Sequence, residues 1–259
     1  MMPYKYLLVF VVGFLSLSAC GACSAWAEDK DFELYKESLE PHADVNKALS
    51  KALEEKKRLI LVIGANWCHD SRSMARKLST AEMKPLLDEH YIIHYTSVGY
   101  YDQALDVSPR FGLPVILGTP TVMIIDPSSH EVVNKSTLHK WRNAYAIDLE
   151  ETVHYFTEHA TASSSVSERP PINKAALARL KLFEEQMAKR VLKGFRHVGP
   201  QLKAYKQGKA PESFNEEWNE LAKFRSTLAK DLKRLKTQLL QDPEKELILP
   251  TYEGFSWNE

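Results

Sequence analysis

Apolar residues recur along the first half of the chain at the spacings of helices that alternate with buried strands. Over residues 44–57, Val45, Leu49 and Leu53 repeat every four positions among good helix formers, which predicts a helix. The continuous apolar run over residues 59–63 has the length of a strand that is covered on both faces. The pattern therefore predicts a helix that leads directly into a central strand.

The following segments continue this alternation as far as residue 159. Their order predicts an α/β fold, in which a mixed sheet carries helices on both faces. The expected elements are helices over residues 71–78 and 83–90 with a kink or fresh start at Pro85, a strand over 91–98, a loop over 99–118 with one turn near 104–111, a strand over 121–125, a turn over 126–129, a short partner strand over 131–134, and a helix over 147–159.

Beyond residue 171 the periodicity is helical only. A first helix begins at residue 172 and is interrupted at Gly199-Pro200, and Ser213 with Glu216 has the pattern of a capping box that opens a second helix. The apolar residues of this second helix follow alternating steps of four and three, and Arg225 occupies one slot: Phe214, Trp218, Leu221, Leu228, Leu232, Leu235 and Leu239. This predicts an α-helical hairpin or coiled coil over residues 172–242, which offers a surface for self-association.

Composition and charge change this picture little. Lysine plus arginine and aspartate plus glutamate number 34 each among 259 residues, so no global field favours a nucleic-acid partner. Residues 174–209 are rich in lysine and arginine. Such a segment forms either a solvated helix face or a binding surface for an anionic partner. The nine histidines lack the spacings of metal sites, and no phosphate loop occurs, so we expect neither a metal nor a cofactor.

The N-terminal segment has the features of an export signal, because Lys5 precedes an apolar run over residues 6–17 that is short for a membrane span. Two processing sites compete. Residues 17–20 end in Cys20 and resemble a bacterial lipobox, whereas residues 25–27 fit ordinary cleavage; an uncleaved anchor is the third interpretation. We expect a signal peptide over residues 1–27, or one ending at Ala19 with lipidated Cys20 as a membrane anchor. Either form of the signal places the protein in the periplasm. In the lipidated form, Gly21 after Cys20 favours attachment to the outer membrane.

The remaining boundaries follow from composition. We expect a first domain over residues 28–159, a linker rich in serine, threonine and proline over 160–171, and a tail over 243–259 after the helical hairpin.

Cys68 is the one cysteine certain to lie in the folded part, because lipidation would consume Cys20 and ordinary cleavage would remove both Cys20 and Cys23. It follows the central strand and precedes a helix, where free backbone N–H groups and the helix dipole stabilise a thiolate. His69 would add positive charge beside it, whereas Asp70 would oppose the thiolate. No structural disulfide framework is expected.

Two landmarks resemble the thioredoxin superfamily, especially its periplasmic thioredoxin-like members. One is the apolar strand followed by Gly64-Ala65-Asn66-Trp67-Cys68, and the other is Gly118-Thr119-Pro120-Thr121 at the start of a strand. The resemblance covers roughly residues 44–156. It implies that Pro120 is cis and faces the active cysteine, and that Thr119 offers its backbone to an extended substrate. It also implies a catalytic set of Trp67, Cys68, His69 and Ser71.

Two positions depart from the family pattern. Ser71 stands where a second cysteine belongs, and Val62 stands where thioredoxins have a buried acid that assists proton transfer. A hydroxyl cannot attack the sulfur of a mixed disulfide, so Cys68 would need a second thiol from the substrate or a small thiol from solution for release. Alternatively, Ser71 hydrogen-bonds the Cys68 thiolate.

Two functions remain open at this point. The first is a monothiol thiol–disulfide protein of the bacterial envelope, with isomerase-like or thiol-dependent reductase activity on protein disulfides or a small thiol. The second is a redox-silent binding module, whose thioredoxin-like fold and basic helical hairpin engage a protein partner. Tyr100 and Tyr101 form either a substrate lip near Pro120 or part of an ordinary loop.

Overall fold

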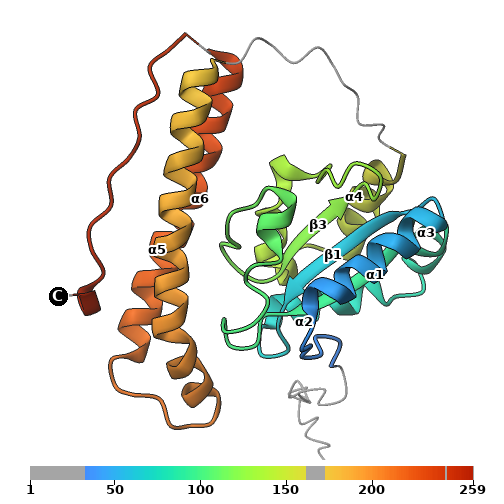
Figure 1. Ribbon diagram of the computed structural model, residues 1–259. Helices are drawn as coiled ribbons and strands as arrows, with labels where there is room; N and C mark the ends of the chain where they lie inside the picture. Colours follow the sequence, from blue (N-terminus) through green and yellow to red (C-terminus); the bar gives the residue numbers. More distant parts are fainter. Residues whose placement is uncertain (1–32, 162–172, 243, 259) are drawn as a thin grey trace, which may run out of the picture. The chain divides into compact units, whose positions relative to one another are not determined.

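A computed structural model describes residues 33–161, 173–242 and 244–258 (Figure 1). The predicted signal peptide, Cys20 and nearly all of the predicted linker lie outside these residues. Among the helices in the described ranges, none combines the length and the apolar character that a membrane span requires.

The sheet has three strands: β1 (Arg58–Gly64), β2 (Tyr91–Ser97) and β3 (Thr121–Ile125). Their order is β2-β1-β3, so β1 is central. It pairs in parallel with β2, from Arg58 opposite Tyr91 to Gly64 opposite Ser97, and antiparallel with β3. The predicted mixed sheet with a central apolar strand is confirmed.

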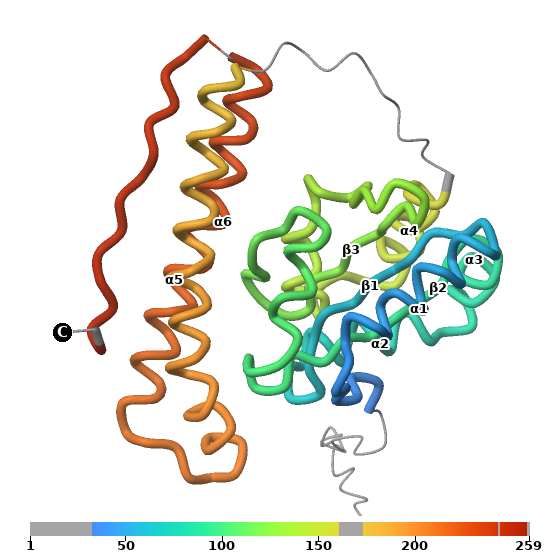
Figure 2. The backbone as a smooth tube through the Cα atoms, viewed as in Figure 1, coloured from blue at the N-terminus to red at the C-terminus, as the bar shows by residue number. Residues whose placement is uncertain are grey.

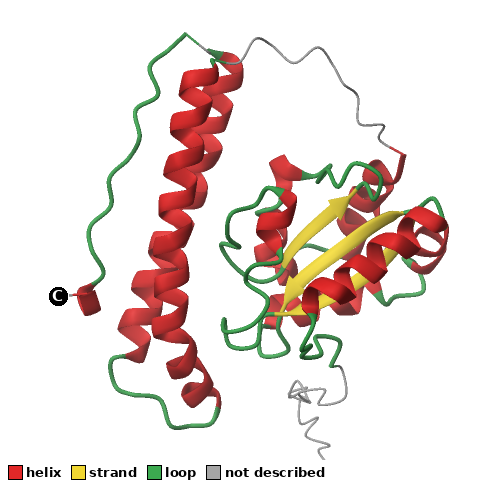
Figure 3. Cartoon of the chain, in the orientation of Figure 1, coloured by secondary structure: helices red, strands yellow, loops and turns green. Residues whose placement is uncertain are grey.

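Helices cover both faces of the sheet, as predicted (Figure 3). The side chains of Leu59, Leu61 and Ile63 belong to a core cluster that includes residues of α1 (Pro41–Glu54). Those of Ile60 and Val62 join the opposite cluster, with residues of α2 (His69–Leu78), α3 (Lys84–His90) and α4 (Leu149–Thr161). This alternation follows from the two-residue repeat of a strand, and it buries β1 on both sides.

Two local predictions in the first domain are confirmed, namely the fresh start at Pro85 and the turn within the loop over 99–118. Pro85 lies in the first turn of α3, so it starts that helix rather than kinking a longer one. The loop over 99–118 carries a 3₁₀ turn at Ser108–Phe111, and two further 3₁₀ segments, Lys135–Thr137 and Lys140–Ala146, precede α4.

The predicted partner strand over residues 131–134 is wrong, because only a single bridge joins Val132 to Ile125. The side chain of Asn134 replaces the missing strand. Its Oδ1 accepts from the Ile124 N–H at 2.8 Å, and its Nδ2 donates to the Val122 carbonyl at 3.0 Å. A buried amide thus satisfies the edge of β3 that a fourth strand would otherwise cover.

The C-terminal helices α5 (Lys174–Lys206) and α6 (Phe214–Gln241) run antiparallel to each other (Figure 2). The apolar stripe predicted from the steps of four and three is the packed face of α6. Its members are buried, except that Trp218 and Leu232 are half-buried. After α6, the segment that was predicted only as a tail packs on the hairpin through buried Leu247 and Phe255.

Two predictions about the ends of these helices are wrong. Gly199 and Pro200 do not interrupt α5, which continues to Lys206. A proline inside a helix costs about 3 kcal/mol, and burial of the neighbouring Val198 and Leu202 side chains offsets that cost. Ser213 makes no cap bond, since its φ of −69° and ψ of −15° are already helical rather than extended.

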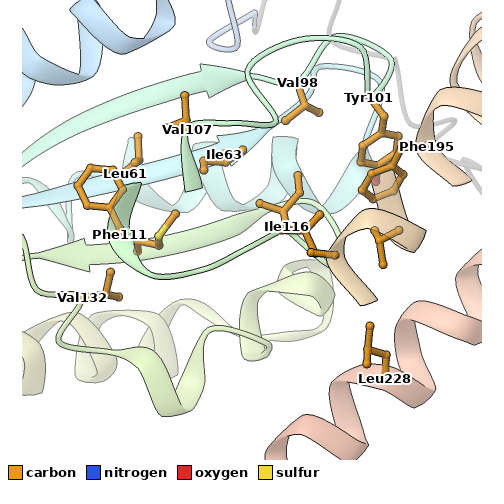
Figure 4. Packing of buried hydrophobic residues seen from close by; sticks show 14 of the residues in the cluster. Leu61, Ile63, Val98, Tyr101, Val107, Phe111, Ile116, Val132, Phe195 and Leu228 are labelled. Atoms are coloured by element: carbon orange, nitrogen blue, oxygen red, sulfur yellow. The ribbon is translucent and has the colours of Figure 1, made fainter. Parts of the chain in front are cut away.

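The core on the α1 face of the sheet continues into the hairpin through the loop that follows β2. The ring of Tyr101 stacks on Phe195 of α5, with centroids 4.0 Å apart and planes inclined by 3° (Figure 4). Beside this stack, a Cβ added to Gly199 would lie 2.4 Å from the Tyr100 carbonyl oxygen. The hairpin therefore contacts the loop closely enough that α5 needs a glycine there.

Replacement of Gly199 by alanine tests this contact. In a free helix the change stabilises by about 1 kcal/mol. Here α5 or the loop must shift away from the new Cβ, so we expect an overpacking loss of about 1–3 kcal/mol. Thermal unfolding measures the loss, and hydrogen exchange should show faster exchange of the amides of residues 99–102. The exposed Lys193→Ala variant should change neither quantity. A Gly199→Ala protein that is more stable than the parent would mean that α5 does not contact the loop in solution.

Candidate functional site

The turn between β1 and α2 places Cys68 at a helix N-terminus, as predicted. The Cys68 N–H donates to the Ala65 carbonyl at 3.1 Å, which closes the turn after β1. Cys68 is the N-cap residue of α2, with an extended backbone (φ −87°, ψ 121°), and its carbonyl accepts the first helical hydrogen bond from Arg72 N–H at 3.0 Å. The sulfur therefore lies where the first N–H groups of α2 have no helical partner.

The two sequence landmarks meet at the sulfur. The Cys68 thiol is free and half-buried, and Sγ donates to the Thr119 carbonyl at 3.3 Å. The Thr119–Pro120 peptide bond is cis, as the resemblance implied. Residues from the start of α2 and from the entry to β3 thus form one site.

Ser71 lies in the first turn of α2, three residues after Cys68. Its side chain is fully buried, and Oγ accepts from the Ala65 N–H at 3.3 Å. This bond fixes the turn and uses the hydroxyl only as an acceptor, so donation from Ser71 to the Cys68 thiolate stays a prediction. A Cβ added to Gly64 would lie 2.7 Å from Ser71 Oγ, so Ser71 also fills the space beside the end of β1.

Tyr35 and Asn66 hold the segment before α1 against the turn. The Tyr35 hydroxyl donates to the Ser71 carbonyl at 3.0 Å, and the Asn66 side chain bonds both the N–H and the carbonyl of Tyr35. Burial, and then the nearby Tyr95 and Cys68, raise the pKa of Tyr35 well above its ordinary value. Tyr35 thus stays a neutral donor. Sequence reasoning missed it because it lies outside any periodic segment.

His69 lies beside Asp70. Its side chain is 64% exposed, and Nε2 is 3.3 Å from Asp70 Oδ2. The other carboxylate oxygen of Asp70 accepts from the Tyr145 N–H at 2.9 Å, which ties α2 to the 3₁₀ segment Lys140–Ala146. Asp70 is therefore occupied by partners on two sides.

Trp67 fixes the tyrosine loop next to the thiol. Its indole N–H donates to the Gly99 carbonyl at 2.7 Å, and its ring meets Tyr101 edge to face, with centroids 5.4 Å apart. Tyr101 has a φ of +65°, a conformation that non-glycine residues adopt rarely. Its hydroxyl lies 3.5 Å from Thr119 Oγ1. Tyr101 therefore lies beside the site, but its side chain is only 2% exposed and packs in the core, so a substrate lip stays a prediction.

A cavity of about 480 Å³ opens next to Cys68. The domain contributes one set of lining residues and the hairpin another, among them Trp218 and Arg225 of α6. The Trp67 and Trp218 rings meet edge to face, with centroids 6.4 Å apart and planes inclined by 80°. Sequence reasoning did not place the hairpin at this site. The one sequence feature that pointed to the hairpin was Arg225, which interrupts the apolar stripe of α6.

Two arginines border the cavity. Arg225 is 7% exposed, and its Nη1 donates to the Leu117 carbonyl at 3.3 Å. Arg142 passes over Gly118, where an added Cβ would lie 2.8 Å from Arg142 Cδ. Burial first, and then the charge of Arg225, lower the pKa of Arg142 below its ordinary value, although Tyr101 acts in the opposite direction. Within the described ranges, no three His, Cys, Asp or Glu side chains are grouped as a metal ion would require.

The comparison with family models agrees with the local geometry. Residues 40–127, which include Cys68 and Pro120, match a family model described as thioredoxin-like. A crystal structure of a disulphide isomerase from Xylella fastidiosa Temecula1 is 26% identical, with 48% of this chain and 95% of that chain covered and a TM-score of 0.45. No curated protein matches the chain. Residues 40–127 thus form a thioredoxin-like domain, with Cys68 at the start of α2 and its sulfur bonded to the carbonyl that precedes the cis-proline.

Proposed function

We propose that this protein exchanges thiols and disulfides through one cysteine, Cys68. The observation that carries this proposal is the position of the sulfur, which is half-exposed at the N-terminus of α2 and 3.3 Å from the carbonyl before the cis-proline. Substrate disulfides reach such a sulfur, and the helix N-terminus stabilises its thiolate.

The capture step follows ordinary exchange chemistry. The Cys68 thiolate attacks one sulfur of a substrate disulfide, the new S–S bond forms as the old one breaks, and the departing thiolate takes a proton from solvent. The first N–H groups of α2 favour the thiolate before attack. The Thr119 carbonyl, which accepts from the thiol, is released on ionisation and becomes available to the substrate backbone.

Release needs a thiol from outside the motif. Ser71 is a hydroxyl, and it is buried and bonded to the Ala65 N–H. Val62 is buried and apolar, so it supplies no proton carrier behind the site. The mixed disulfide therefore persists until a second thiol of the substrate or a small thiol attacks it. The first route gives isomerisation and the second gives reduction.

The proposed compartment is the periplasm, where disulfides persist. The support is the sequence of residues 1–27, with lipidation at Cys20 as the favoured form of attachment. A Cys20→Ala protein should move from the membrane fraction to the soluble fraction on cell fractionation, and a Cys23→Ala protein should not. An unchanged distribution of the Cys20→Ala protein would refute lipid attachment.

Reaction with a neutral small disulfide tests the proposed chemistry. The full chain with Cys20→Ala and Cys23→Ala keeps Cys68 as its single thiol. At about pH 6 an ordinary cysteine is less than about 1% ionised, so we expect this protein to react with hydroxyethyl disulfide faster than a free cysteine does. Intact-mass spectrometry should show one stable adduct per chain. Addition of Cys68→Ser should abolish the adduct. A reaction no faster than that of free cysteine would overturn the proposal and favour a redox-silent binding module.

Restoration of the second cysteine tests the missing release step. In the same background, Ser71→Cys places a thiol three residues after Cys68, within reach of the mixed disulfide. Because the attack becomes intramolecular, we expect the adduct to disappear at least about 100-fold faster, leaving an internal disulfide. Ser73→Cys adds the same group to α2 at the wrong spacing and should leave the adduct stable. Equal adduct lifetimes in the Ser71→Cys protein and its parent would show that the serine is not what prevents release.

A further inference from the structure

The strongest unexplained feature of the site is a buried arginine without a carboxylate. Arg225 occupies a slot that the periodicity of α6 reserves for an apolar residue, yet it is only 7% exposed. Its hydrogen bonds go to the Leu117 and Leu221 carbonyls. Its guanidinium lies over aromatic rings, with its carbon 5.2 Å from the Phe195 centroid and 5.5 Å from that of Trp218. Among the described residues, no ion pair links Arg225 to an acid.

Arg142 brings a second positive charge to the same place. Its Nε is buried, and no described residue accepts a hydrogen bond from it. Its side chain lies against Gly118, where an added Cβ would be 2.8 Å from Arg142 Cδ and 4.0 Å from Arg225 Nη1. Two like charges that share a partly buried site are unfavourable unless an anion joins them.

Both arginines line the cavity that contains Cys68. Its volume of about 480 Å³ lies in the range of small-molecule sites, roughly 300–1,000 Å³. The other charges there are Lys206 and Asp70. Asp70 supplies one negative charge against the three positive charges of the cavity, and its oxygens bond the Tyr145 N–H and contact His69 rather than an arginine. The cavity therefore presents a reactive sulfur and an unbalanced positive charge to the same occupant.

We infer that Arg142 and Arg225 bind the carboxylate of a small thiol or disulfide, whose sulfur is then presented to Cys68. Guanidinium groups match carboxylates with two parallel N–H bonds, which fixes the orientation of the ligand as well as its charge. In the exchange, the Cys68 thiolate forms a bond to one ligand sulfur and the other sulfur leaves as a thiolate. This reaction rests on the proposed function, whereas carboxylate binding does not require Cys68.

Binding without chemistry tests the anion site alone. The probe is S-methylglutathione, a thioether with two carboxylates that cannot form a disulfide. Its dimethyl ester, which keeps the ammonium group but lacks both carboxylates, is the control ligand. Calorimetry on the full chain with Cys20→Ala, Cys23→Ala and Cys68→Ser should show binding of the acid at least tenfold tighter than binding of the ester. Arg142→Met and Arg225→Met should each weaken binding of the acid by about 10- to 100-fold. Neither variant should change the affinity for the ester.

A matched control separates this site from general charge. Lys223→Met removes one positive charge from the exposed side of α6 and should not alter binding. Equal affinity for acid and ester, or equal losses from Lys223→Met and the arginine variants, would overturn the inference. Because Arg225 is buried, its variant is judged only if its unfolding transition matches that of the parent, and Arg142→Met provides the independent test.

Reactivity distinguishes failure of this inference from failure of the proposed function. With Cys68 intact, the arginine variants should slow reaction with dithiodiglycolate, a dicarboxylate disulfide, by at least tenfold and leave the rate with hydroxyethyl disulfide unchanged. If Cys68 reacts with both disulfides regardless of the arginines, the anion site is wrong and the exchange function stands. If the arginines bind S-methylglutathione while Cys68 reacts with neither disulfide, the anion site stands and the exchange function fails.

Discussion

Burial of β1 on both faces is the constraint on which the site depends. Because successive side chains of a strand point to opposite faces, Leu61 and Val62 enter different cores. A slip of one residue would exchange the two sets and leave neither core packed. The end of β1 is thereby fixed in space, and with it the short turn that brings Cys68 to the start of α2 and within 3.3 Å of the Thr119 carbonyl.

The parts of the fold that could be predicted are those in which local pattern and long-range packing agree. The run of five apolar residues in β1 has the length of a covered strand, and helical periodicity resumes shortly after Cys68, so the cysteine is expected near the start of the next helix. The cis-proline was placed by resemblance rather than by periodicity, since nothing local to Pro120 points toward a sulfur in another segment.

The parts that could not be predicted are decided by contacts between distant segments. The side chain of Asn134 replaces a strand that its neighbours predict, and packing of α5 carries that helix through Pro200. Tyr35 and Arg142 gave no signal, because each acquires its role from a partner far along the chain. Local propensity is a weak term at such positions, and buried contacts worth several kcal/mol outweigh it.

Arg225 shows how the hairpin and the domain depend on each other. On an isolated pair of helices, a guanidinium in the apolar stripe would either break the packing or stay in water. Against the domain it gains the Leu117 carbonyl and a position over aromatic rings, so the position makes physical sense only when both parts are present. The same contact places its charge in the cavity beside Cys68. The domain thus supplies the reactive sulfur, while the hairpin supplies a group that can select what reaches it.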